Sequence, residues 1–215
     1  MLLIGYSGHA YVISGILHSM GEKVTGYCDK IEKEYNPLNL KYHGIESSSS
    51  ALKALKAHGF FICVGNNLVR NNIFDSLSAE GLMPVNAIHP KATLDSSISI
   101  SSNGVMIGCN VTINAFSKIH SGAICNTHCV IEHECVIERF AHIAPGAILC
   151  GNVHVGEHSL IGAGAIIREG IRIGKNVVVG AGSVVVKDIE DNAKVVGYPA
   201  RNMIHKSLNL SYVNN

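Results

Sequence analysis

The sequence predicts an α/β domain followed by a parallel β-helix, because its two parts follow different periods. From Ile107 to Val185 an aliphatic residue, or once a cysteine, stands at every sixth position, and a small or β-branched residue follows four places later. A period of six is typical of hexapeptide repeats, in which the first residue points into a narrow prism and the second fits a corner. Before this run, apolar segments of strand length alternate with segments of helical spacing, which indicates a small parallel sheet.

Three hexads form one coil of the predicted β-helix. Each residue then stacks on the one three hexads later, and successive coils pair edge to edge about 4.8 Å apart. A single hexad cannot bury its apolar line, so the stacking of coils creates the core. A β-sandwich is the alternative, but its turns come at irregular intervals and would not keep one register over so long a run.

Residues 1–90 form the predicted α/β domain, with a small Rossmann-like parallel sheet, and residues 91–215 hold the coil and a C-terminal cap. The expected strands are Leu2–Tyr6, Lys23–Cys28, Phe60–Val64 and Met83–Ile88. The expected helices are Val12–Met20, Ala51–Ala57 and Leu68–Leu77.

Composition excludes several function classes. The net charge is +1 and no basic stripe is present, so nucleic acid is not an expected partner. No apolar stretch is long enough to span a membrane, and the N-terminus lacks the basic and apolar regions of a signal peptide. The seven cysteines include no CxxC pair, so we expect buried thiols in a cytoplasmic protein rather than disulfides or a zinc site.

Three strand ends of the α/β domain carry residues suited to a ligand. Ligands of a parallel sheet bind beyond the carboxyl ends of its strands. Ser7, Gly8 and His9 precede a helix whose backbone N–H groups could cradle a phosphate. Asp29 and Lys30 follow the second strand, where a carboxylate could hold a ribose or uracil group, and Gly65 follows the third. A full GxGxxG is absent, so a dinucleotide is not predicted; plain turn glycines are the structural alternative.

One histidine of the coil is placed for general base catalysis. By register Ile131 and Cys135 point inward, so His133 lies on the outer surface between Glu132 and Glu134. A neighbouring carboxylate can orient the ring and raise its basicity. Gly151 lies three hexads later, where it leaves room for a substrate and offers a backbone N–H to an oxyanion. His142 lies near a corner. A surface histidine with solvated acids is the alternative interpretation.

The ordered motifs resemble a known family. They are Tyr6–His9, Val64–Asn67, Ile88–Pro90, Glu132–Cys135 and Val196–Arg201, and they span nearly the whole chain. The chain resembles bacterial sugar acetyltransferases of the sialic acid O-acetyltransferase and bacillosamine-pathway N-acetyltransferase type. It departs from the family pattern at Ala10, usually a glycine, and at Tyr6, usually a small residue.

The resemblance implies a left-handed coil, a homotrimer with sites between subunits, acetyl-CoA as donor and a nucleotide-linked amino sugar as acceptor. It implies that His133 is the catalytic base and that Glu134 tunes it. Positions near the thioester or the CoA arm are His142, Ala163 and Ala181, and Gly151 is the expected amide donor there. Positions of the nucleotide-sugar pocket are Ser7, Gly8, His9, Asp29, Lys30 and Gly65, with Asn126 near the acceptor sugar.

The predicted function is direct acetyl transfer to the 4-amino group of a UDP-linked amino-dideoxy sugar in bacterial glycan synthesis. O-acetylation of sialic acid or another surface sugar is the enzymatic alternative, because a histidine base serves both reactions. No metal is expected. A zinc site built on three histidines is a weaker alternative, with candidates His120, His128, His133, His142, His154 and His158. A purely structural or partner-binding module is weaker still.

Overall fold

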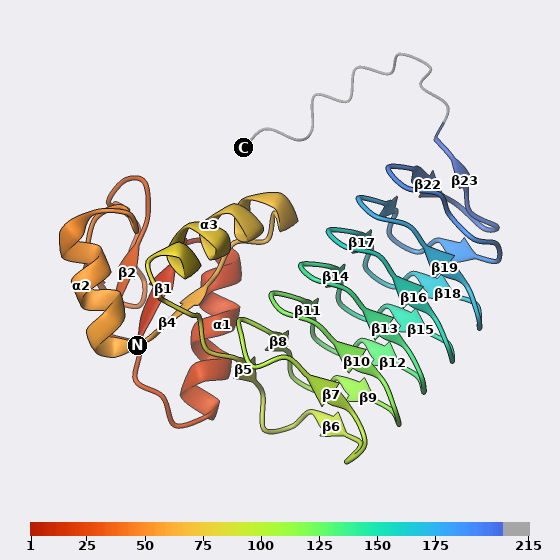
Figure 1. The fold of residues 1–215 in the computed structure, drawn as a ribbon, viewed down its shortest axis with the longest axis horizontal. Coiled ribbons are helices and arrows are strands. Elements are labelled where there is room, and N and C mark those ends of the chain that lie inside the picture. The colour runs from red at the N-terminus through yellow and green to blue at the C-terminus, as the bar shows by residue number, and fades with distance from the viewer. Residues whose placement is uncertain (204–215) are drawn as a thin grey trace.

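A computed structural model describes residues 1–203 of the 215-residue chain. The chain begins with an α/β domain and continues as a β-helix (Figure 1). The first domain has a parallel sheet in the order β3-β2-β1-β4. Its strands are β1 (Leu2–Ile4), β2 (Gly26–Cys28), β3 (Lys41–Tyr42) and β4 (Phe60–Ile62), and its helices are α1 (Gly8–Ser19), α2 (Ser49–His58) and α3 (Asn67–Ala79).

Strands β1, β2 and β4 are buried throughout because both faces of the sheet are covered, as is usual for parallel sheets, whereas the edge strand β3 begins with the exposed Lys41. Leu3 and Phe61 pack with α1, whereas Leu2 and Phe60 pack with α2 and α3. Helices α2 and α3 begin where a side chain caps them: Ser48 accepts from the Ala51 N–H at 3.3 Å, and Asn66 caps α3 likewise. The α2 helix therefore begins two residues before the predicted start.

The coil is a three-faced prism of two- and three-residue strands, paired in parallel with the strand three places on, except that β20 pairs with β22. Face 1 consists of β5 (Ala87–Ile88), β8 (Met106–Ile107), β11 (Ile124–Cys125), β14 (His142–Ile143), β17 (Leu160–Ile161), β20 (Val178–Val179) and β22 (Lys194–Val196), with β23 (Arg201–Asn202) antiparallel at its end. Face 2 consists of β6 (Thr93–Leu94), β9 (Thr112–Ile113), β12 (Val130–Ile131), β15 (Ile148–Leu149), β18 (Ile166–Ile167) and β21 (Val184–Val185). Face 3 consists of β7 (Ser99–Ile100), β10 (Lys118–Ile119), β13 (Val136–Ile137), β16 (His154–Val155) and β19 (Arg172–Ile173).

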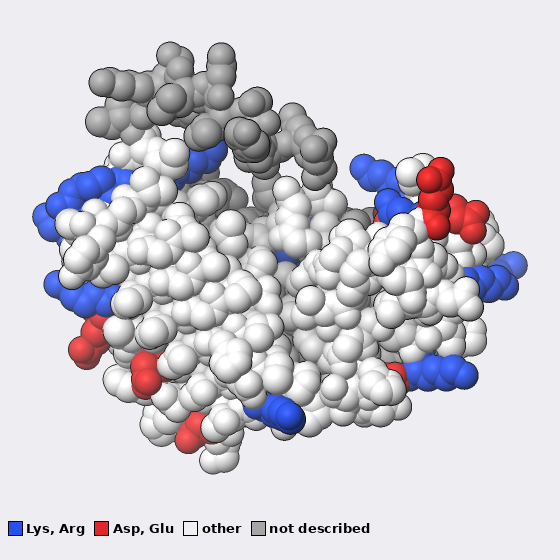
Figure 2. Space-filling model, turned by 180° about the vertical axis from the view of Figure 1, so that it is seen from behind, with Lys and Arg blue, Asp and Glu red and all other residues white. Residues whose placement is uncertain are grey.

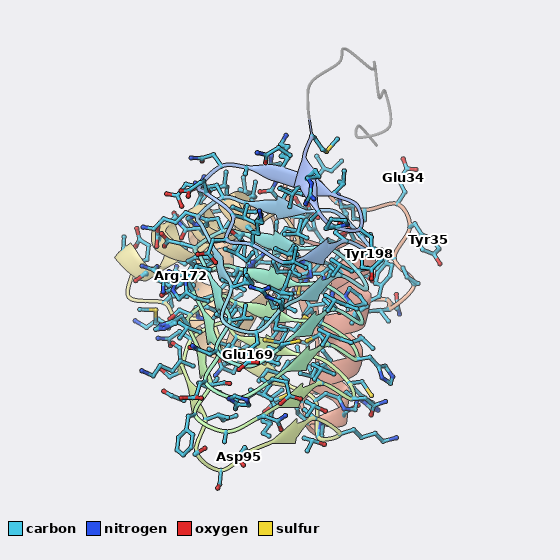
Figure 3. All side chains as sticks on the ribbon, turned by 90° about the vertical axis from the view of Figure 1, so that its right-hand side faces the viewer. Glu34, Tyr35, Asp95, Glu169, Arg172 and Tyr198 are labelled. Carbon is cyan, nitrogen blue, oxygen red and sulfur yellow. The ribbon has the colours of Figure 1, made fainter. Side chains whose placement is uncertain are left out.

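The register of the coil confirms the three-hexad stacking. Ile119 pairs with Ile137, and Ile137 with Val155. Both predicted columns point inward, and Ile131 and Cys135 are fully buried. Residues between the columns point outward, as Figure 3 shows for Glu169 and Arg172. The fold class predicted from the sequence is therefore confirmed.

One predicted strand was wrong. Only the last two residues of the Met83–Ile88 segment form a strand, β5, and this strand pairs with β8 in the coil rather than with the α/β sheet. The physical reason is that Pro84 lacks an amide hydrogen, so a single bond, from the Val85 N–H to the Phe60 carbonyl at 3.0 Å, reaches the sheet. Strand β3 was not predicted.

The α/β domain packs on face 1 of the coil. Helix α1 contacts β5, and outward-facing Met106 and Ile124 join the cluster that holds Ala10 and Ile13. Phe140, at the corner between faces 3 and 1, packs edge-on against Phe74 of α3, with ring centroids 5.3 Å apart. On the side shown in Figure 2 the lysines and arginines lie mainly at the margins, around a broad uncharged surface. No helix among residues 1–203 has the length and apolar character needed to cross a membrane.

Candidate active site

The turn between β12 and β13, at the corner of faces 2 and 3, carries the predicted base. His133 Nδ1 lies 3.0 Å from Glu134 Oε2, and the two side chains are 50% and 61% exposed. Glu132 is engaged elsewhere, because its Oε2 accepts from Asn114 Nδ2 at 2.8 Å. Glu134 is therefore the acid that orients the ring. When Nδ1 carries the hydrogen and donates to Glu134, Nε2 is the atom left to accept a proton.

Glu134 has a backbone conformation that favours glycine. Its φ is 60°, in the left-handed region where most side chains are disfavoured. Other corners of the coil place Gly146 or Asn152 in this conformation. Phe116, His128, Phe140 and His158 adopt it at further corners, so the conformation is a general feature of these turns.

Gly151 lies directly beneath the imidazole ring. A Cβ on this residue would fall 2.5 Å from His133 Nε2. The space that the sequence analysis assigned to a substrate is therefore occupied by the ring itself. The Gly151 carbonyl accepts from the Gly170 N–H at 3.0 Å, whereas the Gly151 N–H donates to no acceptor within residues 1–203. Gly151 itself is buried beneath the ring.

His9 and His142 meet at the seam between the domains rather than in separate sites. Their ring centroids are 6.4 Å apart, and Asn126 Nδ2 lies 3.2 Å from His142 Nε2. Burial, reinforced by the Arg70 charge, lowers the pKa of His9 to about 4 and that of His142 to about 3. Both rings are therefore neutral near pH 7. The predicted pocket residue His9 and the predicted donor-site residue His142 thus share one environment with Asn126.

Arg70, which no pattern in the sequence singled out, holds this seam together. The side chain is 1% exposed and has no acidic partner. Its Nε donates to the Gly122 carbonyl and one Nη donates to the Phe140 carbonyl, each at 2.9 Å, on the coil side. Another Nη donates to the carbonyls of Val64 and Gly65, at 2.9 and 3.1 Å. Oxygen atoms of both domains therefore compensate the buried charge.

Four of the predicted pocket residues line one cavity at the sheet edge. The cavity has a volume of about 270 Å³, and Ser7, Asp29, Lys30 and Gly65 are among its lining residues. Asp29 is held in place, because its Oδ2 accepts from the Tyr6 N–H at 2.9 Å. Ser7 makes no side-chain cap to α1, so the first-turn N–H groups of that helix are open to an anion.

Two of the predicted pocket residues do not line this cavity. Gly8 begins α1, and the helix turns the side chain of His9 away from the sheet edge toward the coil.

The two remaining donor-site residues, and Asn126 of the predicted acceptor-sugar site, lie away from His133 in this chain. Asn126, Ala163 and Ala181 follow β11, β17 and β20 at the corner of faces 1 and 2. Ala163 and Ala181 are exposed. His133 and Gly151 lie at the corner of faces 2 and 3. A whole face of the prism separates the two groups, so one chain alone does not bring them together.

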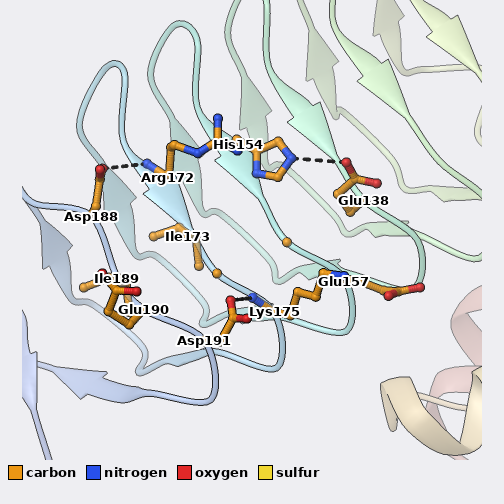
Figure 4. Close-up of a pocket in the computed structure, with 12 residues that line it drawn as sticks. Glu138, His154, Glu157, Arg172, Ile173, Lys175, Asp188, Ile189, Glu190 and Asp191 are labelled. Carbon is orange, nitrogen blue, oxygen red and sulfur yellow. Dashed lines mark hydrogen bonds and ion pairs between the residues drawn. The ribbon is translucent and has the colours of Figure 1, made fainter.

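A larger hollow of about 480 Å³ lies on face 3 and contains none of the residues predicted to bind acetyl-CoA or the sugar nucleotide, although His154, a candidate zinc ligand, lines it (Figure 4). Its carboxylates have a structural explanation. Asp188 accepts from the Arg172 N–H at 2.8 Å, in place of the carbonyl of a further coil, and Asp191 accepts from the Lys175 N–H at 2.7 Å. Within the part of the chain that the structure describes, no three His, Cys, Asp or Glu side chains are grouped as metal ligands.

The chain joins a hexapeptide coil, which carries a histidine–glutamate pair at an exposed corner, to an α/β domain with its own cavity. This combination defines a hexapeptide-repeat transferase. A family model described as the PglD N-terminal domain matches residues 1–77, and one described as the hexapeptide repeat of succinyl-transferase matches residues 152–187. The GDP-perosamine N-acetyltransferase of Escherichia coli O157:H7 is 30% identical over 126 residues, so the match spans 57% of that protein and 57% of this chain.

Solved structures match nearly the whole chain. A histidine-to-asparagine variant of perosamine N-acetyltransferase from Caulobacter crescentus, in complex with CoA and GDP-perosamine, is 34% identical with a TM-score of 0.87, over 94% of this chain and 95% of that one. The acetyltransferase domain of PglB from Neisseria gonorrhoeae FA1090, in complex with acetyl coenzyme A, is 31% identical with a TM-score of 0.84, over 94% and 98%.

The chain therefore belongs to the hexapeptide-repeat sugar acetyltransferases of the bacillosamine-pathway type, the family that its motifs resemble. This membership confirms the predicted class of enzyme, an acetyl-CoA-dependent sugar acetyltransferase.

Proposed function

We propose that the protein transfers an acetyl group from acetyl-CoA directly to the 4-amino group of a nucleotide-linked amino-dideoxy sugar in bacterial glycan synthesis. The observation that carries this proposal is the His133–Glu134 pair at 3.0 Å, on a fold shared with perosamine N-acetyltransferase over 94% of the chain. We place the reaction in the cytoplasm, where the cysteines stay reduced; all seven are free thiols in the structure.

The chemistry follows from the arrangement around His133. The neutral amine attacks the thioester carbonyl carbon while His133 Nε2 takes the proton that the nitrogen loses. The Gly151 N–H donates to the oxyanion that forms, and the intermediate collapses to the amide as the CoA thiolate leaves and takes the proton from His133, which restores the neutral base. A positioned base contributes typically about 10²–10⁴-fold, and an oxyanion donor about 10²–10³-fold.

We propose that two copies of the chain build each site within a homotrimer. The outward residues of face 2 form an apolar column, Val130, Ile148, Ile166 and Val184, in which Ile148 and Ile166 are 37% and 39% exposed. An apolar stripe of this kind favours contact with another copy. When face 2 points toward a three-fold axis, the face 1–2 corner of each copy lies against the face 2–3 corner of the next.

This arrangement brings Asn126, Ala163 and Ala181 of one copy next to His133 and Gly151 of its neighbour. Acetyl-CoA would then lie between the corners, with His142 near the thioester. The cavity of the α/β domain would hold the nucleotide, its phosphates toward the start of α1 and its ribose or base toward Asp29. In this arrangement the domain of residues 1–90 binds the acceptor, and the domain of residues 91–215 binds the donor.

The nucleotide distinguishes two candidate acceptors. The sequence analysis predicts UDP, whereas the perosamine N-acetyltransferase structure contains a guanosine nucleotide. Thiol release from acetyl-CoA should be measured with GDP-perosamine, with a UDP-linked 4-amino-4,6-dideoxy sugar and with sialic acid. Turnover on an amino sugar, with the acetyl group found on nitrogen by mass spectrometry, supports the proposal. Turnover on sialic acid alone would replace it with O-acetylation.

A further inference from the structure

Three of the corner positions inside the prism are filled by serines. Most of these positions hold apolar or thiol side chains, but Ser117, Ser159 and Ser183 are fully buried. A hydroxyl removed from water costs free energy unless it finds hydrogen-bond partners. The partners of each serine therefore indicate what it does for the coil.

Ser117 binds both ends of the turn that carries His133. Its Oγ–H donates to the Glu132 carbonyl at 2.8 Å, and its Oγ accepts from the Cys135 N–H at 3.2 Å. These two backbone groups flank the turn on either side. One buried hydroxyl thus bridges the first carbonyl and the last amide of the turn, and both groups are satisfied through it.

Several turns without a serine in this position close through a direct backbone bond, although in the next turn at the same corner the Cys135 thiol takes the serine's place and donates to the Cys150 carbonyl at 3.2 Å. At the corner of Phe140, for example, the Ala141 N–H donates directly to the Glu138 carbonyl at 3.2 Å. The Ser117 hydroxyl is inserted between the two groups that would form this direct bond. The turn around His133 is therefore held open, and its width depends on the inserted oxygen.

We propose that Ser117 is a positioning residue of the active site, whose hydroxyl sets the turn that aims His133 at the acceptor. The inference rests on the proposed function, because it concerns the same base. Neighbouring coils fix the rest of the turn: the Glu134 N–H donates to the Ala115 carbonyl and the Asn152 N–H to the His133 carbonyl, each at 2.8 Å. The two ends of the turn are joined to each other through the Ser117 hydroxyl.

Ser159 provides a matched control in the same coil. Its Oγ–H donates to the Gly174 carbonyl at 2.7 Å, and its Oγ accepts from the Val177 N–H at 2.9 Å. The bonding pattern is that of Ser117, but the turn lies at the corner of faces 3 and 1 and carries no predicted site residue. Loss of either hydroxyl should therefore have a similar structural cost and a different catalytic cost.

The experiment compares Ser117→Val, Ser117→Thr and Ser159→Val. Valine fits such positions, because Val111 and Val177 are fully buried in them, and threonine has the same shape but keeps the hydroxyl. We expect Ser117→Val to lower kcat about 10- to 100-fold, the range for a misplaced catalytic group, with the KM for acetyl-CoA nearly unchanged. Ser117→Thr should restore most of the turnover, and Ser159→Val should keep it.

Equal losses of turnover in Ser117→Val and Ser159→Val would overturn the inference, as would a threonine variant no better than valine. A crystal structure of Ser117→Val tests the same point without any assay. We expect a direct bond from the Cys135 N–H to the Glu132 carbonyl and a displaced His133 ring; an unmoved ring would also overturn it. Failure of the proposed function looks different, because the wild-type enzyme would then acetylate none of the amino sugars.

Discussion

Gly151→Ala tests the geometry of the base without deleting any polar group. An alanine Cβ would fall 2.5 Å from His133 Nε2, whereas ordinary contact begins near about 3.5 Å. The ring must therefore move by about 1 Å, and a catalytic group misplaced by about 1 Å can lose about 100-fold in rate. The ring is half exposed and can swing outward, so the movement should break the 3.0 Å contact with Glu134 while the fold survives.

The assay is steady-state thiol release on the preferred amino sugar, together with thermal unfolding. We expect kcat to fall about 100-fold, equivalent to about 2.7 kcal/mol, with a melting temperature close to wild type. Gly15→Ala on α1 is the control, because a Cβ there meets nothing within 4 Å. Wild-type turnover in Gly151→Ala would refute the placement of the ring over this glycine in the working enzyme.

Three further predictions concern the seam and the oligomer. Arg70→Met should lower the free energy of unfolding by several kcal/mol, because each buried carbonyl left without a donor costs about 1–3 kcal/mol. A decrease of less than about 1 kcal/mol, measured by urea unfolding, would contradict the role of Arg70 at the seam. The free energy of unfolding should fall as the pH drops from about 6.5 toward 4. In the folded state the pKa of His9 is about 4 and that of His142 is about 3, so both rings stay neutral over this range. In the unfolded chain they bind protons near about pH 6.5, and this proton uptake favours unfolding. The urea midpoint should follow this trend and flatten in His142→Gln, and a flat wild-type profile would refute it. Ile166→Asp should dissociate the trimer, as measured by light scattering, because it places a charge in the face 2 contact. Val178→Asp is the control and should leave the trimer intact, because Val178 is similarly exposed but lies on face 1. An intact Ile166→Asp trimer would exclude face 2 as the interface.

The coil was predictable because each of its positions repeats every hexad. Ile131 and Cys135 are buried as the register requires, and the same register placed His133 outward. The pairing of His133 with Glu134 rather than Glu132 was less visible, because Asn114, one coil away, decides it through a hydrogen bond. A local period shows which way a side chain points and does not show which partner it finds.

The seam between the domains was not predictable from local patterns. Arg70 resembles a surface residue of a helix, and its burial depends on the carbonyls of Gly122 and Phe140, 52 and 70 residues later in the chain. His9 was assigned to the cavity because it follows Ser7 and Gly8. The helix begins at Gly8, however, so the side chain of His9 turns toward the coil. Contacts at such distances in the chain leave no periodic signal.

The most direct test of the shared site is a mixture of two inactive chains. His133→Ala removes the base, and Ala163→Trp blocks the opposite corner. If neighbouring copies share each site, about three quarters of the randomly assembled trimers contain both variants, and each of these has one intact site out of three. The mixture should therefore recover about one quarter of the wild-type sites. We predict this recovery of acetyl transfer on co-expression. Activity no greater than that of either parent would contradict a site built between copies and place it within one chain.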